Sequence, residues 1–558
     1  MMFPLAYAVT SLLLVIIYTK LRYKRFKEYS GLPQFPPSLI WGNLETLYEF
    51  SRLRGFDQHP DHILHEILKA AGWPQLFLLD VWPLRSPLLL VASHEVSEQL
   101  SKPTEIFPFG SPKSPSMTIE LGRLIGAKSV LTTSGEEWRT IRKRYNPAFS
   151  HQQLLGYIPS ISEKTQIYLE NLDILSNSGK EFELLRLCLN LSLDVIGKVV
   201  LGLDLNAQHS IPNQLIQDYL KLQGTYNGLL AVIPGWVVPL IDLKRQRLEK
   251  SVNKAIEKHI QHVFNNMQEN YSDIDDQDSH KSVLSQVLQH IDSLTPEILS
   301  ETRDQLKSFL LAGRDTTGTA IAWAIYELSL TPHALKEVRG EVNAILGQQT
   351  DTTSIYSKII SARIADKDML GRMPYTQAVV KETLRLHPPV GAMRYIKRGT
   401  GLTVHDSSTG KTHCLDGLAV YLCMPAIHRN PNVYGETADA FCPERWLDST
   451  ESAKVPTTAW RPFERGPRGC IGQELAMTEI CLVLALVAQR YDFRKRGLGE
   501  ATVNTKGEPI VDSKTRQHKV IDELYNVLQL VPKPVDGMRM EVEFAKSVSE
   551  EESTVSAT

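Results

Sequence analysis

One cysteine of this chain stands in a setting that suits metal binding. Cys470 lies in residues 463–472, FERGPRGCIG, a glycine-rich bend that leads into a predicted helix. A cysteine binds a metal ion as the thiolate, and both a nearby arginine and the positive end of a helix favour that charged form. The glycines let the backbone approach a flat ligand, and amides freed by such turns can point at the sulfur. The loop therefore predicts a thiolate ligand facing a macrocycle.

A second chemical motif lies inside the longest predicted helix, which begins at its expected N-cap Thr295 and ends at Leu330 before a Thr-Pro pair. Residues 312–318 of that helix read AGRDTTG. Two glycines and two adjacent threonines are poor helix formers. A local opening there would expose an acid, Asp315, and an alcohol, Thr316, which suits a proton relay.

Two further patterns place arginines beside groups that they could bind. Glu382 and Arg385 share one face of a predicted helix over residues 374–387, and the run FCPERW at 441–446 supplies Arg445. Alone, such a Glu-Arg spacing is a solvated ion pair worth a few tenths of a kcal/mol.

Upstream, Trp138 and Arg142 stand one helical turn apart, so that both can face one ligand. Arginine is the residue that binds buried anionic groups most effectively.

In this order and spacing, the motifs resemble those of the cytochrome P-450 superfamily. The ligand signature F-x-x-G-x-R-x-C-x-G matches residues 463–472 without a mismatch, and A-G-x-D/E-T-T matches residues 312–317. The pair E-x-x-R, the element F-x-P-E-R-W and the motif W-x-x-x-R are also present, and the resemblance extends from residue 32 to about 535. A polar insert at 348–366 departs from the pattern and is expected to be a surface loop.

The resemblance implies a role for each motif. Cys470 would be the axial thiolate of a haem b iron, and Asp315 with Thr316 would deliver protons. Arg314, at the variable position of its motif, is interpreted as a charge on the helix face. Glu382, Arg385 and Arg445 would form a structural triad that fixes the cysteine loop. The remaining haem contacts would come from Trp138, Arg142, Arg394, Phe463, Arg468 and Gly472.

Composition and pattern indicate a large, mostly helical globular protein. The 558 residues are 42% hydrophobic and 22% charged with a net charge of -2, a balance that does not call for nucleic acid. No cysteine pair has a metal-binding or disulfide-framework spacing, as in a reducing compartment. Short strands are expected near 75–81, 88–91 and 419–422. The expected class is mainly α with small β-sheets, and the resemblance implies the cytochrome P-450 fold.

The N-terminus predicts a membrane anchor. Residues 3–18 are almost uninterruptedly apolar, and five basic residues between 20 and 27 follow them while none precedes. This asymmetry predicts a single span with the following domain in the cytosol, at the endoplasmic reticulum. The predicted division is a transmembrane helix at 1–19, a basic and proline-rich linker at 20–38, a haem domain at 39–540 and a disordered tail at 541–558. The apolar run 228–241 is either a loop that dips into the membrane or a buried turn.

The resemblance implies a monooxygenase whose electrons come from NADPH through a separate NADPH-cytochrome P-450 reductase, with cytochrome b5 as a further candidate donor. Lys143, Arg144 and Arg465 are candidates for the docking face, although a solvated set of charges explains them equally well. Largely apolar segments near 103–131, 224–240, 309–312 and 390–393 would line a pocket for a lipophilic small molecule.

Anchored filamentous-fungal members that oxidise polyketide, terpenoid or alkaloid intermediates, mycotoxins among them, are the most similar by pattern. A fatty-acid or sterol hydroxylase stays open as the alternative. The residues present bear on three other classes. A haem-thiolate isomerase or dehydratase often lacks the acid-alcohol pair, which this chain has. A non-catalytic membrane-tethered protein would tolerate loss of Cys470 or Thr316, both of which are present, and a secreted peroxygenase would need a cleavable signal.

Overall fold

The structure is a computed structural model that describes residues 2–82, 85–228, 238–269, 281–347, 357, 370–447 and 454–545. These residues fall into two compact units, each made of three stretches of chain. Unit 1 comprises Met1–Ser114, Gly391–Gly435 and Pro456–Gly469. Unit 2 comprises Pro115–Val390, Glu436–Val455 and Cys470–Thr558. Cys470 is therefore the first residue of its stretch of unit 2, and the seven residues that precede it in the 463–472 loop, 463–469, belong to unit 1.

Unit 1 is built on a four-stranded sheet in the order β1-β2-β7-β4. Strand β2 pairs in parallel with β7, and the other neighbours are antiparallel. Successive residues of β1 face opposite sides of the sheet, so Leu76 and Leu78 join one apolar cluster while Phe77 and Leu79 join another against α3. The three strands expected from the sequence are present. The elements of unit 1 are α1 (Met2–Tyr23), η1 (Lys24–Glu28), α2 (Leu44–Arg54), α3 (Pro60–Ala70), β1 (Leu76–Leu79), β2 (Leu88–Val91), α4 (His94–Ser101), β4 (Ala392–Tyr395), β5 (Thr403–Asp406), β6 (Lys411–Cys414), β7 (Ala419–Leu422), α17 (Met424–His428) and α18 (Pro431–Tyr434).

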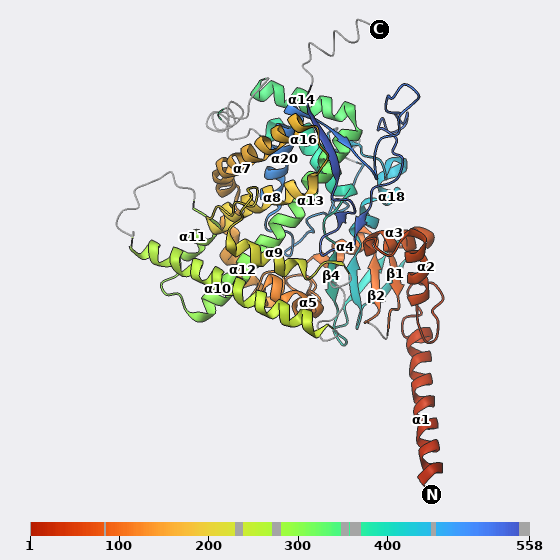
Figure 1. Cartoon of the computed structure of the whole chain (residues 1–558). Coiled ribbons are helices and arrows are strands. Elements are labelled where there is room, and N and C mark those ends of the chain that lie inside the picture. The colour runs from red at the N-terminus through yellow and green to blue at the C-terminus, as the bar shows by residue number, and fades with distance from the viewer. Residues whose placement is uncertain are drawn as a thin grey trace. The chain divides into compact units, whose positions relative to one another are not determined.

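The N-terminal helix α1 extends away from the sheet of its own unit (Figure 1). Among the described residues, no helix combines the length and the apolar content that crossing a membrane requires. The predicted transmembrane anchor at 1–19 includes residues 1–8, whose side chains lie outside the described part of the chain. Within α1, polar Thr10, Ser11 and Thr19 interrupt the apolar run and Lys20 and Arg22 close it.

Part of the predicted linker at 20–38 is integrated into unit 1. Arg25 is buried, forms an ion pair with Asp80 and donates a hydrogen bond to the Ile40 carbonyl at 2.9 Å. Leu32 belongs to the apolar cluster under the sheet, and the Pro33 carbonyl accepts a hydrogen bond from the Leu78 amide at 2.8 Å. The packed part of unit 1 therefore begins before residue 39.

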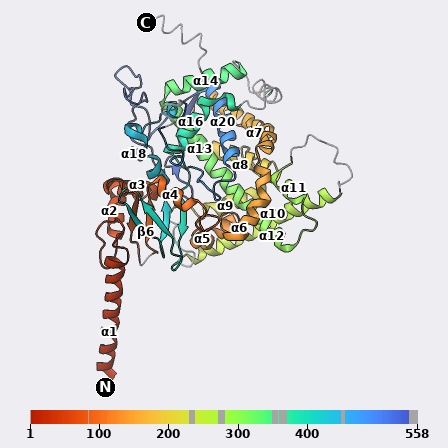
Figure 2. The ribbon, with the colours of Figure 1, turned by 180° about the vertical axis from the view of Figure 1, so that it is seen from behind.

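Unit 2 is mainly helical, and its centre is α13. Helices α8, α16 and α20 all pack against α13, and both views show α8, α13 and α20 grouped together (Figures 1 and 2). All but one of the residues of α13 are buried, because neighbours surround it on every side. The helices of unit 2 are α5 (Pro115–Ile125), α6 (Gly135–Tyr145), η2 (Asn146–Phe149), α7 (His151–Ser178), α8 (Leu184–Ile196), η3 (Gly197–Leu201), α9 (Gln214–Gly224), α10 (Pro239–Glu269), α11 (Val283–Leu288), α12 (Pro296–Leu311), η6 (Ala312–Thr316), α13 (Thr317–Leu330), α14 (Pro332–Leu346), η7 (Leu370–Arg372), α16 (Pro374–Leu386), η9 (Pro443–Trp446) and α20 (Gln473–Arg490). A short helix, η8 (Gly435–Thr437), joins the stretches of the two units.

The strands of unit 2 form two small sheets, β3-β11-β8 and β10-β9. Their bounds are β3 (Phe182–Glu183), β8 (Tyr491–Lys495), β9 (Asn526–Val527), β10 (Lys533–Pro534) and β11 (Arg539–Phe544). The predicted boundary at residue 540 falls inside β11, because Glu541–Phe544 pair with β8. The rest of the predicted tail, residues 546–558, lies outside the described residues, as do residues 229–237 of the apolar run and nearly all of the polar insert.

Candidate functional site

The loop before Cys470 is shaped by one glycine that cannot be replaced without rearrangement. Gly466 has φ +72°, and a Cβ there would lie 2.3 Å from the Ser101 carbonyl oxygen. Gly472 differs, because its φ is -93° and the space on its Cβ side is open. The missing side chain of Gly472 leaves room for a ligand, whereas that of Gly466 serves the turn itself.

A buried ion-pair network in unit 1 holds the same loop. Arg461 is fully buried and donates to Glu464 Oε1 at 2.7 Å and to Glu98 Oε2 at 2.8 Å. Glu464, whose φ is +56°, also pairs with Arg394 of β4 at 3.4 Å. Burial lowers the pKa of Arg394, and the charge of Glu464 opposes that effect. Arg394, a predicted haem contact, is thus already engaged by a carboxylate within its own unit.

Phe463 and Arg468 complete the predicted set in unit 1. The ring of Phe463 packs edge-on against Trp460 with centroids 5.9 Å apart. Arg468 is half-buried, and its Cγ lies 3.6 Å from the position that a Cβ on Gly110 would take.

In unit 2, Cys470 stands just before the N-terminus of α20, whose N-cap residue is Gly472. Its thiol is exposed, whereas Cys188, Cys423 and Cys481 are buried. Arg142 of α6 lies close enough for its guanidinium to interact electrostatically with Cys470. Burial lowers the pKa of Arg142, and Cys470 acts in the opposite direction. An exposed sulfur beside a cation and a helix N-terminus is the setting that favours a thiolate ligand. Trp138, one turn before Arg142, is buried in the same helix.

The motif AGRDTTG at residues 312–318, which we call the distal motif, opens the long helix as the sequence predicts. Helix α12 is capped by Thr295, whose hydroxyl accepts a hydrogen bond from the Ile298 amide at 3.3 Å. The π-helical segment η6 follows at Ala312–Thr316, before α13 continues to Leu330. Ala312 is exposed although the residues before and after it on the helix are largely buried. The Thr316 hydroxyl donates to the Ala312 carbonyl at 2.6 Å.

The glycines of this motif serve close helix packing. A Cβ on Gly313 would lie 2.5 Å from the side chain of Ile196, and one on Gly318 would lie 2.9 Å from the Cys188 carbonyl oxygen. Both contacts are with α8. The sequence alone suggested that these glycines weaken the helix, whereas in the structure they let α8 approach it.

Asp315 is buried in a closed network of charges within unit 2. Its Oδ2 accepts from Lys533 Nζ at 2.8 Å and from Gln223 Nε2 at 2.6 Å, and its Oδ1 accepts from Arg314 at 2.5 Å. Burial acts to raise the pKa of Asp315, but the charges of Lys533 and Arg314 outweigh it and hold that pKa below its usual value. Arg314 is therefore the partner of the acid and not a charge on the helix face, because its guanidinium turns inward to Asp315 and Gln223.

The predicted Glu-Arg-Arg triad comes together within unit 2. Glu382 and Arg385 are both fully buried and form two hydrogen bonds of 2.8 Å. Arg445 Nε donates to Glu382 Oε1 at 3.2 Å. Glu382 also accepts from the Cys442 amide at 3.0 Å and from the Trp446 indole at 2.9 Å. Burial acts to raise the pKa of Glu382, and the two arginines lower it overall.

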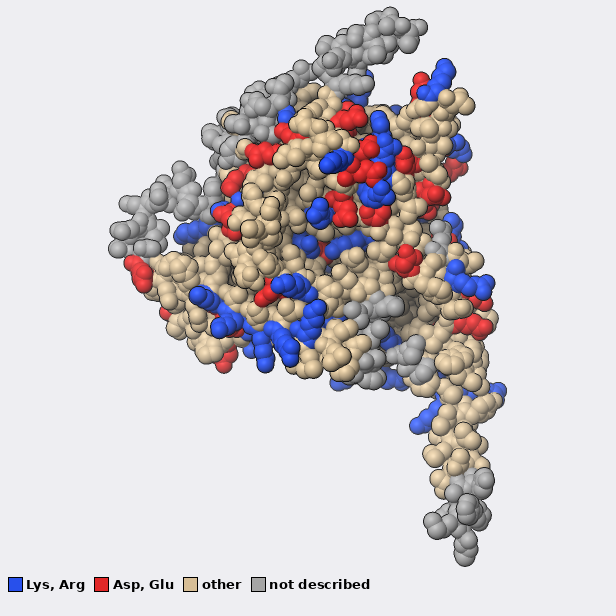
Figure 3. All heavy atoms as spheres, in the orientation of Figure 1, with Lys and Arg blue, Asp and Glu red and all other residues tan. Residues whose placement is uncertain are grey.

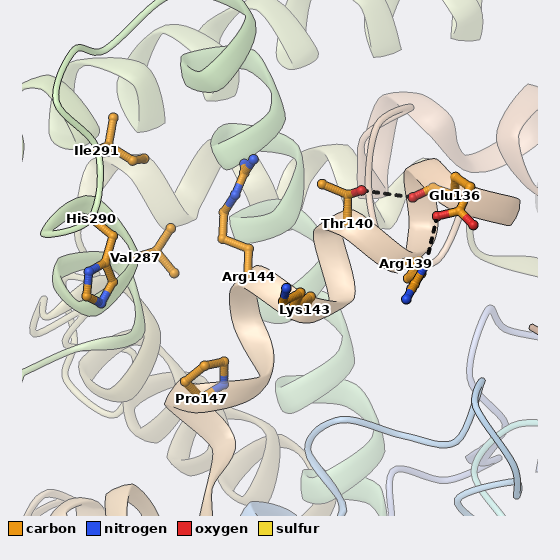
Figure 4. A pocket seen from close by; sticks show the side chains of 9 residues that line it. All are labelled: Glu136, Arg139, Thr140, Lys143, Arg144, Pro147, Val287, His290 and Ile291. Atoms are coloured by element: carbon orange, nitrogen blue, oxygen red, sulfur yellow. Dashed lines mark hydrogen bonds and ion pairs between the residues drawn. The ribbon is translucent and has the colours of Figure 1, made fainter.

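An open pocket of about 620 Å³ lies elsewhere, on the outer side of α6 (Figure 4). Its lining residues come from α6, from Pro147 and from the region of α11, and none is a predicted site residue. Of the three candidate docking charges, Lys143 lines this pocket, Arg144 pairs with Glu301, and Arg465 pairs with Glu98 in unit 1. The pocket is therefore distinct from the candidate metal-binding site.

The residues of unit 2 fit a haem. The exposed thiol of Cys470, the neighbouring guanidinium of Arg142 and the exposed helix opening at Ala312 have the donor chemistry and the access that such a group needs. Sequence reasoning missed Lys533 and Gln223, because no motif connects them to Asp315. It also missed Arg461 and Glu464, whose link to Arg394 depends on tertiary contact. Trp446 could have been found, since it belongs to the same F-x-P-E-R-W element as Arg445.

Comparison with known proteins gives a consistent result. The family model described as Cytochrome P450 matches residues 61–520. The chain is 27% identical over 510 residues to the cytochrome P450 monooxygenase acrF of Aspergillus aculeatus, covering 87% of this chain and 97% of that protein. It is 27% identical over 526 residues to the cytochrome P450 monooxygenase polC of Polytolypa hystricis, covering 88% of each. The crystal structure of the cytochrome P450DA haem domain shares the fold, with a TM-score of 0.68 at 20% identity over 92% of this chain and 98% of that one.

Proposed function

The chain belongs to the cytochrome P450 family, and on that premise we propose that it inserts one oxygen atom from O2 into a lipophilic small molecule of a fungal secondary-metabolite pathway. The family and the two monooxygenase relatives make it an oxidoreductase that uses molecular oxygen. The substrate class rests on two fungal relatives and on the largely apolar segments expected to line the pocket.

The observation that carries the proposal is the exposed thiol of Cys470 beside Arg142 at the start of α20. In the proposed site, Cys470 ligates the haem iron as a thiolate. Arg142 and Trp138 of unit 2 bind haem from α6, and Arg394, Phe463, Arg468 and Gly472 are the further proposed contacts. When bound, a haem with a thiolate ligand supplies the activation of O2.

The chain's own contribution to the reaction is proton handling on the distal side. In the proposal, the Asp315 carboxylate accepts a proton from water and releases it into the opening of η6, and the Thr316 hydroxyl orients the path of the proton by hydrogen bonding. Buried Glu382 and Arg385, together with half-buried Arg445, keep the segment around 438–446 fixed on α16, which is a structural role.

The proposed electron source is NADPH through a separate reductase, with cytochrome b5 as a further donor. The proposed location is the endoplasmic reticulum surface, with the catalytic domain on the cytosolic side. Two features support a membrane partner. Helix α1 exposes apolar side chains from Leu12 to Ile17. On α10, Glu249 pairs with Arg123 of α5, and Glu257 pairs with Arg303 of α12.

The second feature is the outer face of α10, which carries four lysines and an arginine. Figure 3 shows these basic side chains gathered along that helix. Such a face is attracted to anionic lipid. The residues are Lys244, Arg247, Lys250, Lys254 and Lys258.

Two experiments test the function. A screen of polyketide, terpenoid and alkaloid intermediates by Soret shift, with lauric acid and ergosterol as the alternative classes, identifies the ligands. Turnover of a ligand under isotopically labelled dioxygen with NADPH and purified reductase should then give a product with one labelled oxygen atom. A product that takes its oxygen from water, or that rearranges without added oxygen, would contradict the proposal.

A further inference from the structure

The acid of the distal helix is fastened to a segment near the C-terminus of the chain. Lys533 lies in β10, which pairs with β9 in the register Lys533 to Val527. Its ammonium reaches Asp315 at 2.8 Å, and its side chain is only 9% exposed. A lysine is rarely buried without a charge partner, so this contact is what allows the β9-β10 segment to carry a lysine at that position.

The same acid is fastened to α9. Gln223, near the end of that helix, donates to Asp315 Oδ2 at 2.6 Å and accepts from Arg314 at 3.1 Å. The Gly228 amide, just beyond α9, donates to the Leu528 carbonyl at 3.0 Å. The end of α9, the β9-β10 segment and η6 are therefore connected in a closed set of polar contacts with Asp315 at its centre.

Both proton-relay groups are occupied in this arrangement. The oxygens of Asp315 together accept from Lys533, Gln223 and Arg314, and the Thr316 hydroxyl donates to the Ala312 carbonyl. The position of the carboxylate is thus set by two segments distant in sequence, one of which adjoins the region expected to line the substrate pocket. A displacement of the end of α9 or of the β9-β10 segment would therefore also displace the Asp315 carboxylate.

We propose that Lys533 is a positioning residue for Asp315: it holds the distal carboxylate against α9 and the β9-β10 segment, so that the placement of those segments governs proton delivery. Lys533 acts through Asp315 and touches no reacting atom. Only the turnover arm of the following test rests on the function proposed above.

The first arm measures amide hydrogen exchange of the full-length protein by mass spectrometry. Val535 donates to the Tyr525 carbonyl at 3.0 Å, so the amides of Val535 and Gly228 report on the closed network. Lys533→Met should accelerate exchange at both by about tenfold, because local opening becomes easier. Lys533→Arg should restore protection. Lys506→Met, a change at an exposed lysine elsewhere in unit 2, should change neither. If Lys533→Met does not fold, Asp315→Asn breaks the same contact from its other side and should accelerate the same amides.

The second arm measures how reconstituted enzyme with NADPH and reductase reduces dioxygen in the absence of substrate. Reduction to hydrogen peroxide consumes one NADPH and one proton, and reduction to water consumes two of each. The peroxide share should rise about twofold or more in Lys533→Met and in Asp315→Asn, and remain as in the wild type in Lys533→Arg. The double variant should match Asp315→Asn alone, because Lys533 acts through that carboxylate.

Unchanged exchange in Lys533→Met, or additive peroxide shares in the double variant, would overturn the inference. A wild-type protein without the shifted Soret band of its reduced carbon monoxide complex would instead refute the proposed function, and the exchange result would remain valid.

Discussion

Two buried carboxylates in unit 2 have the same chemistry and different surroundings. Glu382 and Asp315 each lie against two cationic side chains, and each is almost completely buried. Glu382 is bound by a fully buried arginine from its own helix, a backbone amide and an indole. Asp315 is bound by a lysine and a glutamine from two distant segments, and its chain neighbour Thr316 is only half-buried beside the exposed Ala312. The Glu382 site fixes the segment around 438–446 on its helix. The Asp315 site holds its acid through side chains of distant segments that can move.

The largest expected effect is the loss of the Glu382 network. Glu382→Gln leaves Arg385 buried with an uncompensated charge, and breaking such a pair costs about 3 to 5 kcal/mol. Asp315→Asn should cost less, because Lys533 and Arg314 retain 9% and 11% exposure and can turn toward water. Denaturant unfolding of the two variants measures both losses. Equal losses would contradict the distinction between a fixed and a movable carboxylate.

A smaller effect is expected where α8 meets the distal helix. Gly318→Ala would place a Cβ 2.9 Å from the Cys188 backbone carbonyl, so the helices must separate, at about 1 to 3 kcal/mol. Gly340→Ala in α14 is the matched control, since a Cβ there meets nothing within 4 Å. The control should be neutral or stabilising by up to about 1 kcal/mol. Thermal unfolding compares them, and a Gly318→Ala protein as stable as the wild type would show that the packing is looser than described.

A third buried carboxylate, Glu479 of α20, has a hydroxyl partner and no ion pair with any described residue, which sharpens the comparison. Its Oε1 accepts from the Ser192 hydroxyl at 2.7 Å, and burial raises its pKa from the usual 4.5 to about 8. Between pH about 4.5 and 8, Glu479 is protonated in the folded protein and ionised in the unfolded chain. The free energy of unfolding therefore falls as pH rises through that range.

The contribution of Glu479 to the free energy of unfolding should change by at most about 1.4 kcal/mol per pH unit. Glu479→Gln removes this dependence and should raise the unfolding midpoint more at pH about 8 than at pH about 5. Glu382 and Asp315 have the opposite sign, because their pKa values are lowered and their contributions are lost as pH falls. A Glu479→Gln variant with the wild-type pH slope would contradict the assignment.

The comparison also shows what sequence reasoning could reach. The Glu382 site was predictable because Arg385 is three residues away on one helix and Arg445 belongs to a recognisable element. The opening at Ala312–Thr316 was predictable because the adjacent threonines are poor helix formers, and the structure places a π-helical segment there. The partners of Asp315 were not predictable, since Lys533 lies in a short β-strand whose pairing depends on tertiary structure. The role of Gly313 and Gly318 was misjudged because close approach by α8 leaves no trace in the local pattern. The membrane span was predicted from an apolar run whose helix includes polar and basic residues.

The central claim is that the sulfur of Cys470 ligates the haem iron. Cys470→Ala and the matched control Cys414→Ala, which alters another exposed cysteine, are to be purified and reduced under carbon monoxide. The wild type and Cys414→Ala should show the shifted Soret band of a thiolate-ligated haem, and Cys470→Ala should lose it. Retention of that band in Cys470→Ala would contradict the claim.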